Sequence, residues 1–177
     1  MLSLETTQVR SISEEKMVAS FQTEGCVAFV TGANRNNGIG RAIVNALLKN
    51  GAKKVYATAR SKEEMVESQE FATSYNNNSD DETSSVVVPM VLDVTDLDAI
   101  QQLPEQCPDV TLIVNNAGHA EVNNSLGDIE IARKQMEINY LGPMAIVSSL
   151  APLWQQQKAN NTPSDAEVDT TNNIIRI

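Results

Sequence analysis

The sequence predicts an α/β fold in which a doubly wound parallel sheet is covered by helices on both faces. Two observations predict this class. Short apolar runs alternate along the chain with segments whose apolar residues recur every three or four positions, the order of strands and helices in such sheets. The apolar run at residues 26–30 also leads straight into a glycine-rich turn at residues 31–40 and then into a helical pattern, as in the first unit of this architecture.

The first two units follow from apolar runs and from residues that end helices. A strand is predicted at residues 26–31 and a helix at residues 38–50. Gly51 ends that helix, because glycine readily adopts the left-handed conformation found just after helices. A second strand is predicted at residues 54–59, and a short polar helix at residues 61–70.

The next two strands are predicted at residues 86–93 and 110–115. Pro89 lies inside the first of them and cannot donate to a sheet ladder, so we expect that strand to lie at an edge of the sheet or to begin late. The acidic polar run at residues 76–83 has no periodicity and is expected to be a solvated surface insertion.

Two helices are predicted in the second half of the chain. One covers residues 95–105, with Thr95 or Asp96 as its cap, and a long one covers residues 128–156. The apolar stripe of the long helix consists of Met136, Tyr140, Pro143, Ile146, Val147 and Leu150.

The chain ends in a polar linker at residues 159–171 and in apolar residues 174–177, which read as a fifth strand cut off in mid-course. A length of 177 residues leaves no room for two good cores. We therefore expect one partial domain at residues 25–177, with the sheet truncated at the fifth strand. A loosely ordered extension at residues 1–24 precedes it.

The composition excludes several classes of function. A formal net charge of −10 argues against nucleic acid as a partner, since that binding requires a basic surface. No apolar run approaches the roughly 20 residues that span a bilayer. The N-terminal segment has no apolar signal core and is too acidic for a transit peptide, and two cysteines make no disulfide framework. We expect a cytoplasmic protein with no membrane partner and no metal site.

The glycine-rich turn predicts a site for a dinucleotide phosphate. Glycines allow a tight turn and let the backbone approach a pyrophosphate. Amide groups at the start of the following helix, together with the helix dipole, hold the anion. The candidate cofactor-binding residues of the turn are Gly32, Asn34, Arg35, Gly38, Ile39 and Gly40.

Arg60 makes NADP the expected cofactor and NAD the less favoured one. It follows the second strand, about twenty residues after the turn, where an NAD site places an acidic residue for the ribose. An arginine there can pair with a 2′-phosphate, and Arg35 in the turn is a second candidate partner. The alternative for both arginines is a solvated surface charge.

Two further strand ends are expected to face the same crevice, since ligands bind outside the carboxyl ends of parallel strands. Asp93 and Val94 end the third strand, where the aspartate can accept a hydrogen bond from an adenine amino group. Residues 115–118, with the sequence Asn-Asn-Ala-Gly, end the fourth strand. The alternative for this tetrapeptide is a simple turn.

These motifs, together with residues 139–142 (Asn-Tyr-Leu-Gly), resemble the front part of a classical short-chain dehydrogenase/reductase, from about Gly25 to the end of the chain. The resemblance implies a Rossmann-type fold and hydride transfer between NAD(P)H and a small carbonyl or alcohol. It also implies that the glycine turn holds the pyrophosphate and that Asp93 and Val94 flank the adenine. The residues implied to lie near the nicotinamide are Asn115, Ala117 and Gly118.

By the same resemblance, Asn139 matches the structural asparagine of the family's catalytic tetrad. Pro143 lies four residues later and cannot donate to the Asn139 carbonyl, so we expect a kink that frees this carbonyl. In the family, the corresponding carbonyl holds a water of the proton relay. The alternative is a polar residue on the side of a helix that Pro143 bends for packing.

The sequence departs from the family pattern in two respects. Five residues, not the usual three, separate the Thr-Gly pair from Gly-x-Gly, so Asn36 and Asn37 read as an insertion. Loops absorb insertions at little entropic cost, and asparagine tolerates a left-handed backbone. The family's active-site serine and Tyr-x-x-x-Lys are also missing. His119, the only histidine, lies at the expected substrate mouth or on a solvated loop.

We therefore expect the cofactor-binding part of an NADP-preferring oxidoreductase, present here as a fragment that binds dinucleotide without turnover. The parent protein is expected to form homo-oligomers, as is usual in the family. The alternative is a non-catalytic module that binds NADP(H) or another protein.

Overall fold

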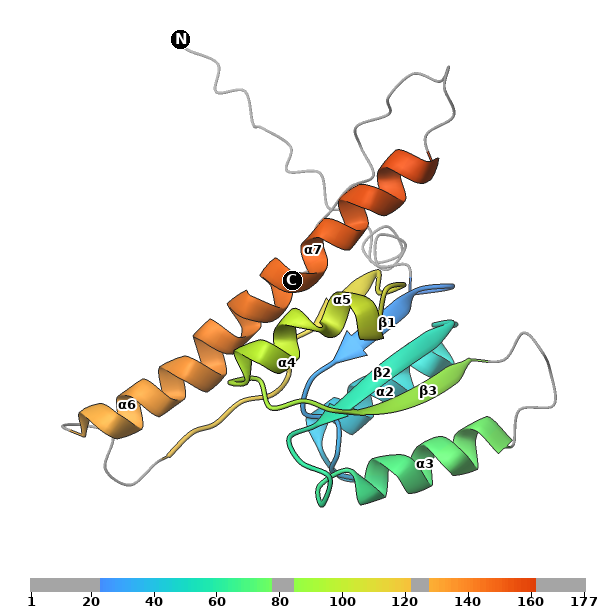
Figure 1. Cartoon of the computed structure of the whole chain (residues 1–177). Helices are drawn as coiled ribbons and strands as arrows, with labels where there is room; N and C mark the ends of the chain where they lie inside the picture. The colour runs from blue at the N-terminus through green and yellow to red at the C-terminus, as the bar shows by residue number, and fades with distance from the viewer. Residues whose placement is uncertain (1–22, 78–84, 122–127, 162–177) are drawn as a thin grey trace, which may run out of the picture.

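The computed structural model describes residues 23–77, 85–121 and 128–161. In this part, four strands form one parallel sheet (Figure 1): β1 (Val27–Val30), β2 (Lys54–Ala59), β3 (Val86–Val91) and β4 (Leu112–Val114). Each strand lies within its predicted range. Most of the predicted extension, most of the acidic run, the linker beyond residue 161 and the predicted fifth strand fall outside the described residues.

The order of the strands confirms the doubly wound sheet. It is β3-β2-β1-β4, and every neighbouring pair is parallel. The chain therefore moves outward from β1 to β3 and then crosses to the other side of β1 to form β4. Such a reversal creates a switch point between β1 and β4, and ligands bind at the carboxyl ends of the strands there.

Helices cover both faces of the sheet (Figure 1). α2 (Ile39–Lys49) and α3 (Val66–Asn77) lie on one face. α4 (Leu97–Gln101), α5 (Leu103–Gln106) and α7 (Gly142–Asn161) lie on the other. Each layer buries its own apolar cluster against the strands, so the sheet is the middle of three layers.

Alternation along β1 supplies both clusters, because successive side chains of a strand point to opposite faces. Phe29 packs with Ile146 and Leu150 of α7. Val30, the next residue, packs in the other cluster with Val44 of α2. All of these side chains are fully buried, and burying one such side chain contributes about 1.5–3 kcal/mol.

Two predicted helices differ from the observed ones. Residues 61–65 form turns, and α3 begins only at Val66. Ser61 accepts a hydrogen bond from the Glu64 amide, and the Met65 amide donates to the Lys62 carbonyl three residues back, a tighter turn than that of an α-helix. The predicted helix at residues 95–105 is two short helices, α4 and α5. Asp96 caps α4 by accepting from the Ala99 amide at 3.0 Å.

The predicted long helix is present but interrupted. α6 (Ile129–Met136) and α7 are joined by a π-helical segment, η1 (Glu137–Leu141). Of the predicted stripe, Ile146 and Leu150 are buried, whereas Met136 and Tyr140 are 53% and 54% exposed. The reason is visible in Figure 1, where α6 extends beyond the sheet and only α7 lies against α4 and α5.

Strand β3 lies at an edge of the described sheet, as Pro89 predicts. The amides of Val86 and Leu92 donate to carbonyls beside or at the end of β2. The backbone N–H and C=O groups of the odd-numbered residues between them therefore point away from β2. Asn76 of α3 binds the outward groups of Val87. Its Oδ1 accepts from the Val87 amide and its Nδ2 donates to the Val87 carbonyl, both at 3.0 Å.

Candidate dinucleotide site

The glycine-rich turn is anchored on both sides of β1. The Thr31 amide donates to the Val114 carbonyl of β4 at 3.1 Å, and the Ala33 amide donates to the Thr58 carbonyl of β2 at 2.8 Å. The Gly32 amide also donates to the Thr58 hydroxyl at 3.3 Å. The turn is therefore held between two strand ends, at the switch point of the sheet.

Two of the three predicted glycines are required by close approach. Gly32 has a φ of +66°, and a Cβ there would lie 3.0 Å from Cα of Ala117. A Cβ on Gly40 would overlap the Gly32 carbonyl and lie 2.6 Å from Nδ2 of Asn116. Gly38, the N-cap of α2, has an ordinary φ of −91°. Thus Gly32 and Gly40 bring the turn against the chain that follows β4.

The Asn36–Asn37 insertion forms a turn of its own. The Gly38 amide closes it by donating to the Arg35 carbonyl at 2.9 Å. Among the described residues, only glycines have a positive φ, so the two asparagines do not use the left-handed conformation that they tolerate. The insertion lengthens the loop without straining its backbone.

This inserted turn docks on α3. The Asn36 amide donates to Oε2 of Glu67 at 3.0 Å. The Asn36 side chain accepts from Nη1 of Arg41 at 3.2 Å. The insertion is thus fixed to the neighbouring helix.

Arg41 is a site residue that the sequence analysis missed. It is only 4% exposed, although a charge on the first turn of a helix ordinarily faces solvent. Its guanidinium donates to the Ala33 carbonyl and to the Ser68 hydroxyl, and it lies 4.1 Å above the ring of Phe71. Burial lowers the pKa of Arg41 and the Glu67 carboxylate raises it, but arginine stays charged at neutral pH.

Asn116 and Thr31 connect the glycine turn to β4, and neither is among the predicted site residues. The Thr31 hydroxyl accepts from the amides of Asn116 and Ala117, both at 2.9 Å. Nδ2 of Asn116 donates to the carbonyls of Thr31 at 2.8 Å and Gly32 at 3.0 Å. The Asn-Asn-Ala-Gly segment is therefore bonded to the glycine turn.

Asn139 reaches the same place from the helical layer. Its Oδ1 accepts from the His119 amide at 2.8 Å, and its Nδ2 donates to the His119 carbonyl at 2.7 Å. A Cβ on Gly118 would lie 3.5 Å from Oδ1 of Asn139. The predicted tetrad asparagine thus holds the chain just after the fourth strand.

The helix can approach because Gly142 has no side chain. A Cβ there would lie 2.5 Å from the carbonyl oxygen of Val94, which lies in the loop between β3 and α4. The Gly142 amide bonds to the Glu137 carbonyl, five residues back, directly before Pro143. The predicted disturbance of the helix at Asn139 is therefore present, as a π-helical turn, a feature often found at functional sites.

The predicted charged residues are less closely integrated. Arg60 pairs with Glu64 on the surface. The Arg35 side chain is exposed and has no hydrogen bond or ion pair within the described residues. Oδ1 of Asp93 accepts from the amide and the hydroxyl of Thr95. Arg35 lies in the glycine turn itself, whereas Arg60 and Asp93 lie on loops after strand ends. Among the described residues, the side chains of Arg60 and Asp93 bond to Glu64 and Thr95 and not to the glycine turn.

Three other predicted residues are Ile39, Asn34 and Asn115. Ile39 is the first residue of α2 and is 76% exposed. Asn34 is half-buried in the turn. Oδ1 of Asn115 is buried and has no hydrogen-bond partner among the described residues.

The part of the chain that the structure covers has neither a cluster of metal ligands nor a helix that could span a membrane. No three histidine, cysteine or acidic side chains there lie close enough together to hold a metal ion. None of the helices described is both long and apolar enough to cross a bilayer.

The chain is similar to known dehydrogenases that are at least twice as long as the segment that matches. The NADP-dependent 3-hydroxy acid dehydrogenase of Schizosaccharomyces pombe is 30% identical over 138 residues, which cover 74% of this chain and 49% of that protein. The short-chain dehydrogenase fogG of Aspergillus ruber is 27% identical over 142 residues, 78% of this chain and 39% of that protein. The chain thus spans half or less of the length of these relatives.

Solved structures have the same architecture. A short-chain dehydrogenase from Burkholderia cenocepacia in complex with NADP matches with a TM-score of 0.60 and 35% identity, covering 77% of this chain and 51% of that one. NADPH-bound carbonyl reductase from chicken fatty liver matches with a TM-score of 0.60 and 27% identity, covering 75% and 52%. The family model for short chain dehydrogenase matches residues 26–162, so the chain, with its Rossmann-type sheet and glycine turn, belongs to the short-chain dehydrogenase family.

Proposed function

We propose that this chain forms the cofactor-binding part of an oxidoreductase that prefers NADP and transfers a hydride between the nicotinamide and a small carbonyl or alcohol. The observation that carries the proposal is the convergence of the glycine turn, residues 115–118 and Asn139 at the carboxyl ends of β1 and β4. Relatives whose structures hold NADP or NADPH support the choice of cofactor.

The start of α2 is suited to the pyrophosphate. The N-cap of α2 is Gly38, which has no side chain that could accept from the first amides of the helix. The first turn also has no acidic residue. The amides of the first turn therefore have no side-chain cap, and the positive end of the helix dipole favours an anion beside them. In this proposal Gly32, Asn34, Gly38, Ile39 and Gly40 line the pyrophosphate.

The remaining contacts divide between the two ends of the cofactor. Arg60, with Arg35 as a second partner, would pair with the 2′-phosphate, and Asp93 and Val94 would flank the adenine. At the other end, residues 115–118 would lie near the nicotinamide.

Reduced nicotinamide supplies the hydride when the cofactor is bound. The contribution of Asn139 is positional, because its side chain holds the backbone of His119 at the mouth of the crevice. The sequence contains no Tyr-x-x-x-Lys, so this proposal assigns no proton donor. We expect the 177-residue chain to bind NADPH without turnover.

Fluorescence titration of the chain with NADPH and NADH tests this proposal, together with NADPH consumption in the presence of simple ketones and aldehydes. We expect NADPH to bind more tightly than NADH, and Arg60→Asp to reverse that order. Equal affinities before and after the substitution would dismiss Arg60 as the phosphate partner. No binding of either nucleotide would overturn the proposal and favour a nucleotide-independent interaction module.

A non-catalytic NADP(H)-binding module is the second candidate, and the lack of Tyr-x-x-x-Lys in this sequence favours it. A longer transcript that encodes a serine and a Tyr-x-x-x-Lys after residue 177 would decide for the enzyme. We also propose homo-oligomers, formed through the exposed apolar face of α6, η1 and α7. By this face we mean the exposed large apolar side chains of these elements, which are Ile129, Met136, Tyr140, Leu141 and Met144.

A further inference from the structure

In the free protein, the donors beside the proposed 2′-phosphate position already bind carboxylates. Arg60 donates through Nη2 to Oε1 of Glu64, four residues later. The Arg60 side chain is 65% exposed and that of Glu64 34%, so solvent and ligands can reach this pair. An exposed pair of this kind is weak and exchanges readily.

A second carboxylate binds the phosphate turn. Oε2 of Glu67 accepts from the Asn36 amide at 3.0 Å. Glu67 follows Glu64 by three residues, at the start of α3. The bond from the Ala33 amide to the Thr58 carbonyl places the phosphate turn beside the end of β2. The two carboxylates therefore lie along the seam between the phosphate turn and the loop that carries Arg60.

We propose that Glu64 and Glu67 set the cofactor preference of this chain by competing with the 2′-phosphate of NADP for the Arg60 guanidinium and the Asn36 amide. This inference rests on the proposed function, in which Arg60 faces that phosphate. When NADP binds, its phosphate oxygens replace Glu64 on Arg60, and the Glu64 carboxylate turns to solvent. NAD has an uncharged 2′-hydroxyl, which can donate to a carboxylate and does not repel it.

The two carboxylates do not contribute equally. Arg41 lies beside Glu67, donates to its backbone carbonyl at 3.4 Å and is buried. Its charge offsets that of Glu67, whereas Glu64 is paired with Arg60, the group for which the phosphate competes. Glu64 therefore has the larger effect on the ratio of NADPH to NADH affinity.

The test compares three single substitutions in the full 177-residue chain: Glu64→Gln, Glu67→Gln and, as the control, Glu70→Gln. Glu70 is an exposed acid on the next turn of α3, so its substitution removes the same charge away from both donors. Dissociation constants for NADPH and NADH are measured by nicotinamide fluorescence. Those for 2′,5′-ADP and 5′-AMP are measured by calorimetry.

We expect Glu64→Gln to raise the ratio of NADPH to NADH affinity by about three- to tenfold, from the lost competition and the lost repulsion of a doubly charged phosphate. Glu67→Gln should raise it less, and Glu70→Gln by less than about twofold. The ratio of 2′,5′-ADP to 5′-AMP affinity should move in parallel, because the nicotinamide takes no part.

An unchanged or lowered ratio in Glu64→Gln, with both nucleotides still bound, would overturn this inference and leave the proposed function intact. A wild-type chain that binds neither nucleotide would overturn the proposed function and this inference with it. Circular dichroism of each variant checks the fold. If Glu64→Gln does not fold, Glu64→Ala replaces it, with the same expected direction.

Discussion

At the scale of single residues, asparagine side chains make the connections on which the site depends. Asn116 donates to two carbonyls of the glycine turn, and Asn139 both donates to and accepts from the backbone of His119. An amide side chain carries a donor and an acceptor, as a peptide group does, so it can pair with backbone where no strand is present. Glutamine or aspartate cannot replace these pairs without a change of reach or the loss of a donor.

Asn139→Asp isolates the donor half of the pair with His119. The carboxylate can still accept from the His119 amide but cannot donate to its carbonyl. We expect hydrogen exchange at the amides of residues 118–120 to accelerate by about fivefold, which corresponds to a loss of about 1 kcal/mol. Asn139→Ala, which removes both bonds, should accelerate it further; equal rates in all three proteins would contradict the role of the pair.

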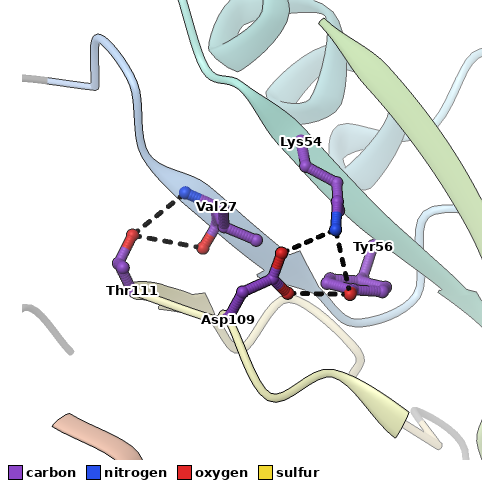
Figure 2. Close-up of polar contacts among 5 residues, drawn as sticks. All are labelled: Val27, Lys54, Tyr56, Asp109 and Thr111. Atoms are coloured by element: carbon purple, nitrogen blue, oxygen red, sulfur yellow. Dashed lines mark hydrogen bonds and ion pairs between the residues drawn. The ribbon is translucent and has the colours of Figure 1, made fainter. Parts of the chain in front are cut away.

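A second polar cluster lies away from the carboxyl ends of the strands and joins β2 to the segment before β4 (Figure 2). Nζ of Lys54 lies 2.6 Å from Oδ2 of Asp109, and the Tyr56 hydroxyl donates to Oδ1 of Asp109 at 2.8 Å. The hydrogen bond to Asp109 raises the pKa of Lys54. Burial raises the pKa of Asp109, but the hydrogen bonds from Lys54 and Tyr56 lower it by more, so the net pKa lies below the usual value.

Asp109→Asn should lower the free energy of unfolding by about 1 kcal/mol at neutral pH, a value reduced for the partial exposure of the pair. The folded-state pKa of Asp109 is lowered, so its contribution is present above about pH 4 and is lost as the pH falls through the lowered value. The contribution of Lys54, whose pKa is raised, is lost only above about pH 10. Urea unfolding at several pH values checks this: the two proteins should differ from pH 5 to 9 and converge in acid.

At the scale of elements, strand β3 shows how an exposed sheet edge is closed. Pro89 has no N–H to offer a further strand, and Asn76 occupies both outward groups of Val87. Unpaired edges are templates for aggregation, and proteins block them by such means. The C-terminal turn of α3 therefore protects the edge in addition to packing on the sheet.

Asn76→Ala should expose the amide and carbonyl of Val87 and promote self-association. We expect light scattering at high protein concentration to increase relative to wild type, with little change in far-ultraviolet circular dichroism. Asn45→Ala, at an exposed position on α2, is the control and should scatter like wild type. If Asn76→Ala remains monodisperse at the same concentration, Pro89 alone protects the edge.

At the scale of the whole molecule, local patterns in the sequence predicted the strands, their parallel order and the convergence of the glycine turn with residues 115–118. Apolar alternation and glycine spacing are local properties, so a single sequence carries them. The start of α3 was predicted too early because residues 62–65 form tight turns, in which the Met65 amide donates to the Lys62 carbonyl.

Other features depend on contacts between distant segments and could not be read from local pattern. Arg41 is buried because Ser68 and Phe71 of α3 cover it. The residues next to Arg41 in the sequence do not predict this burial, because the covering residues lie about thirty positions later. Asn115 and Asn116 are adjacent residues of the same type, and the sequence pattern does not distinguish them. Of their two side chains, that of Asn116 bonds to Thr31 and Gly32, which lie 85 and 84 residues earlier in the chain. The π-helical turn was anticipated only as a kink, since Pro143 removes a donor without specifying how the helix responds.

The exposed apolar face of α6, η1 and α7 gives a prediction about assembly. Large exposed apolar patches are usually covered by a partner. Replacing Met136 and Tyr140, which are more than half exposed, by lysine should shift sedimentation velocity profiles toward monomer. Lys134→Glu, an exposed change on α6, is the control; an unaltered profile in the double variant would place the contact elsewhere.

The Thr31 hydroxyl, which accepts from two successive amides, limits how the crevice can open. Parting β1 from the segment after β4 would leave both N–H groups without an acceptor in a half-buried place, a penalty of about 1–3 kcal/mol for each. The junction between β1 and the segment after β4 is therefore the more rigid side of the candidate site. Movement at the candidate site is expected instead where Asn139 and His119 meet at the surface.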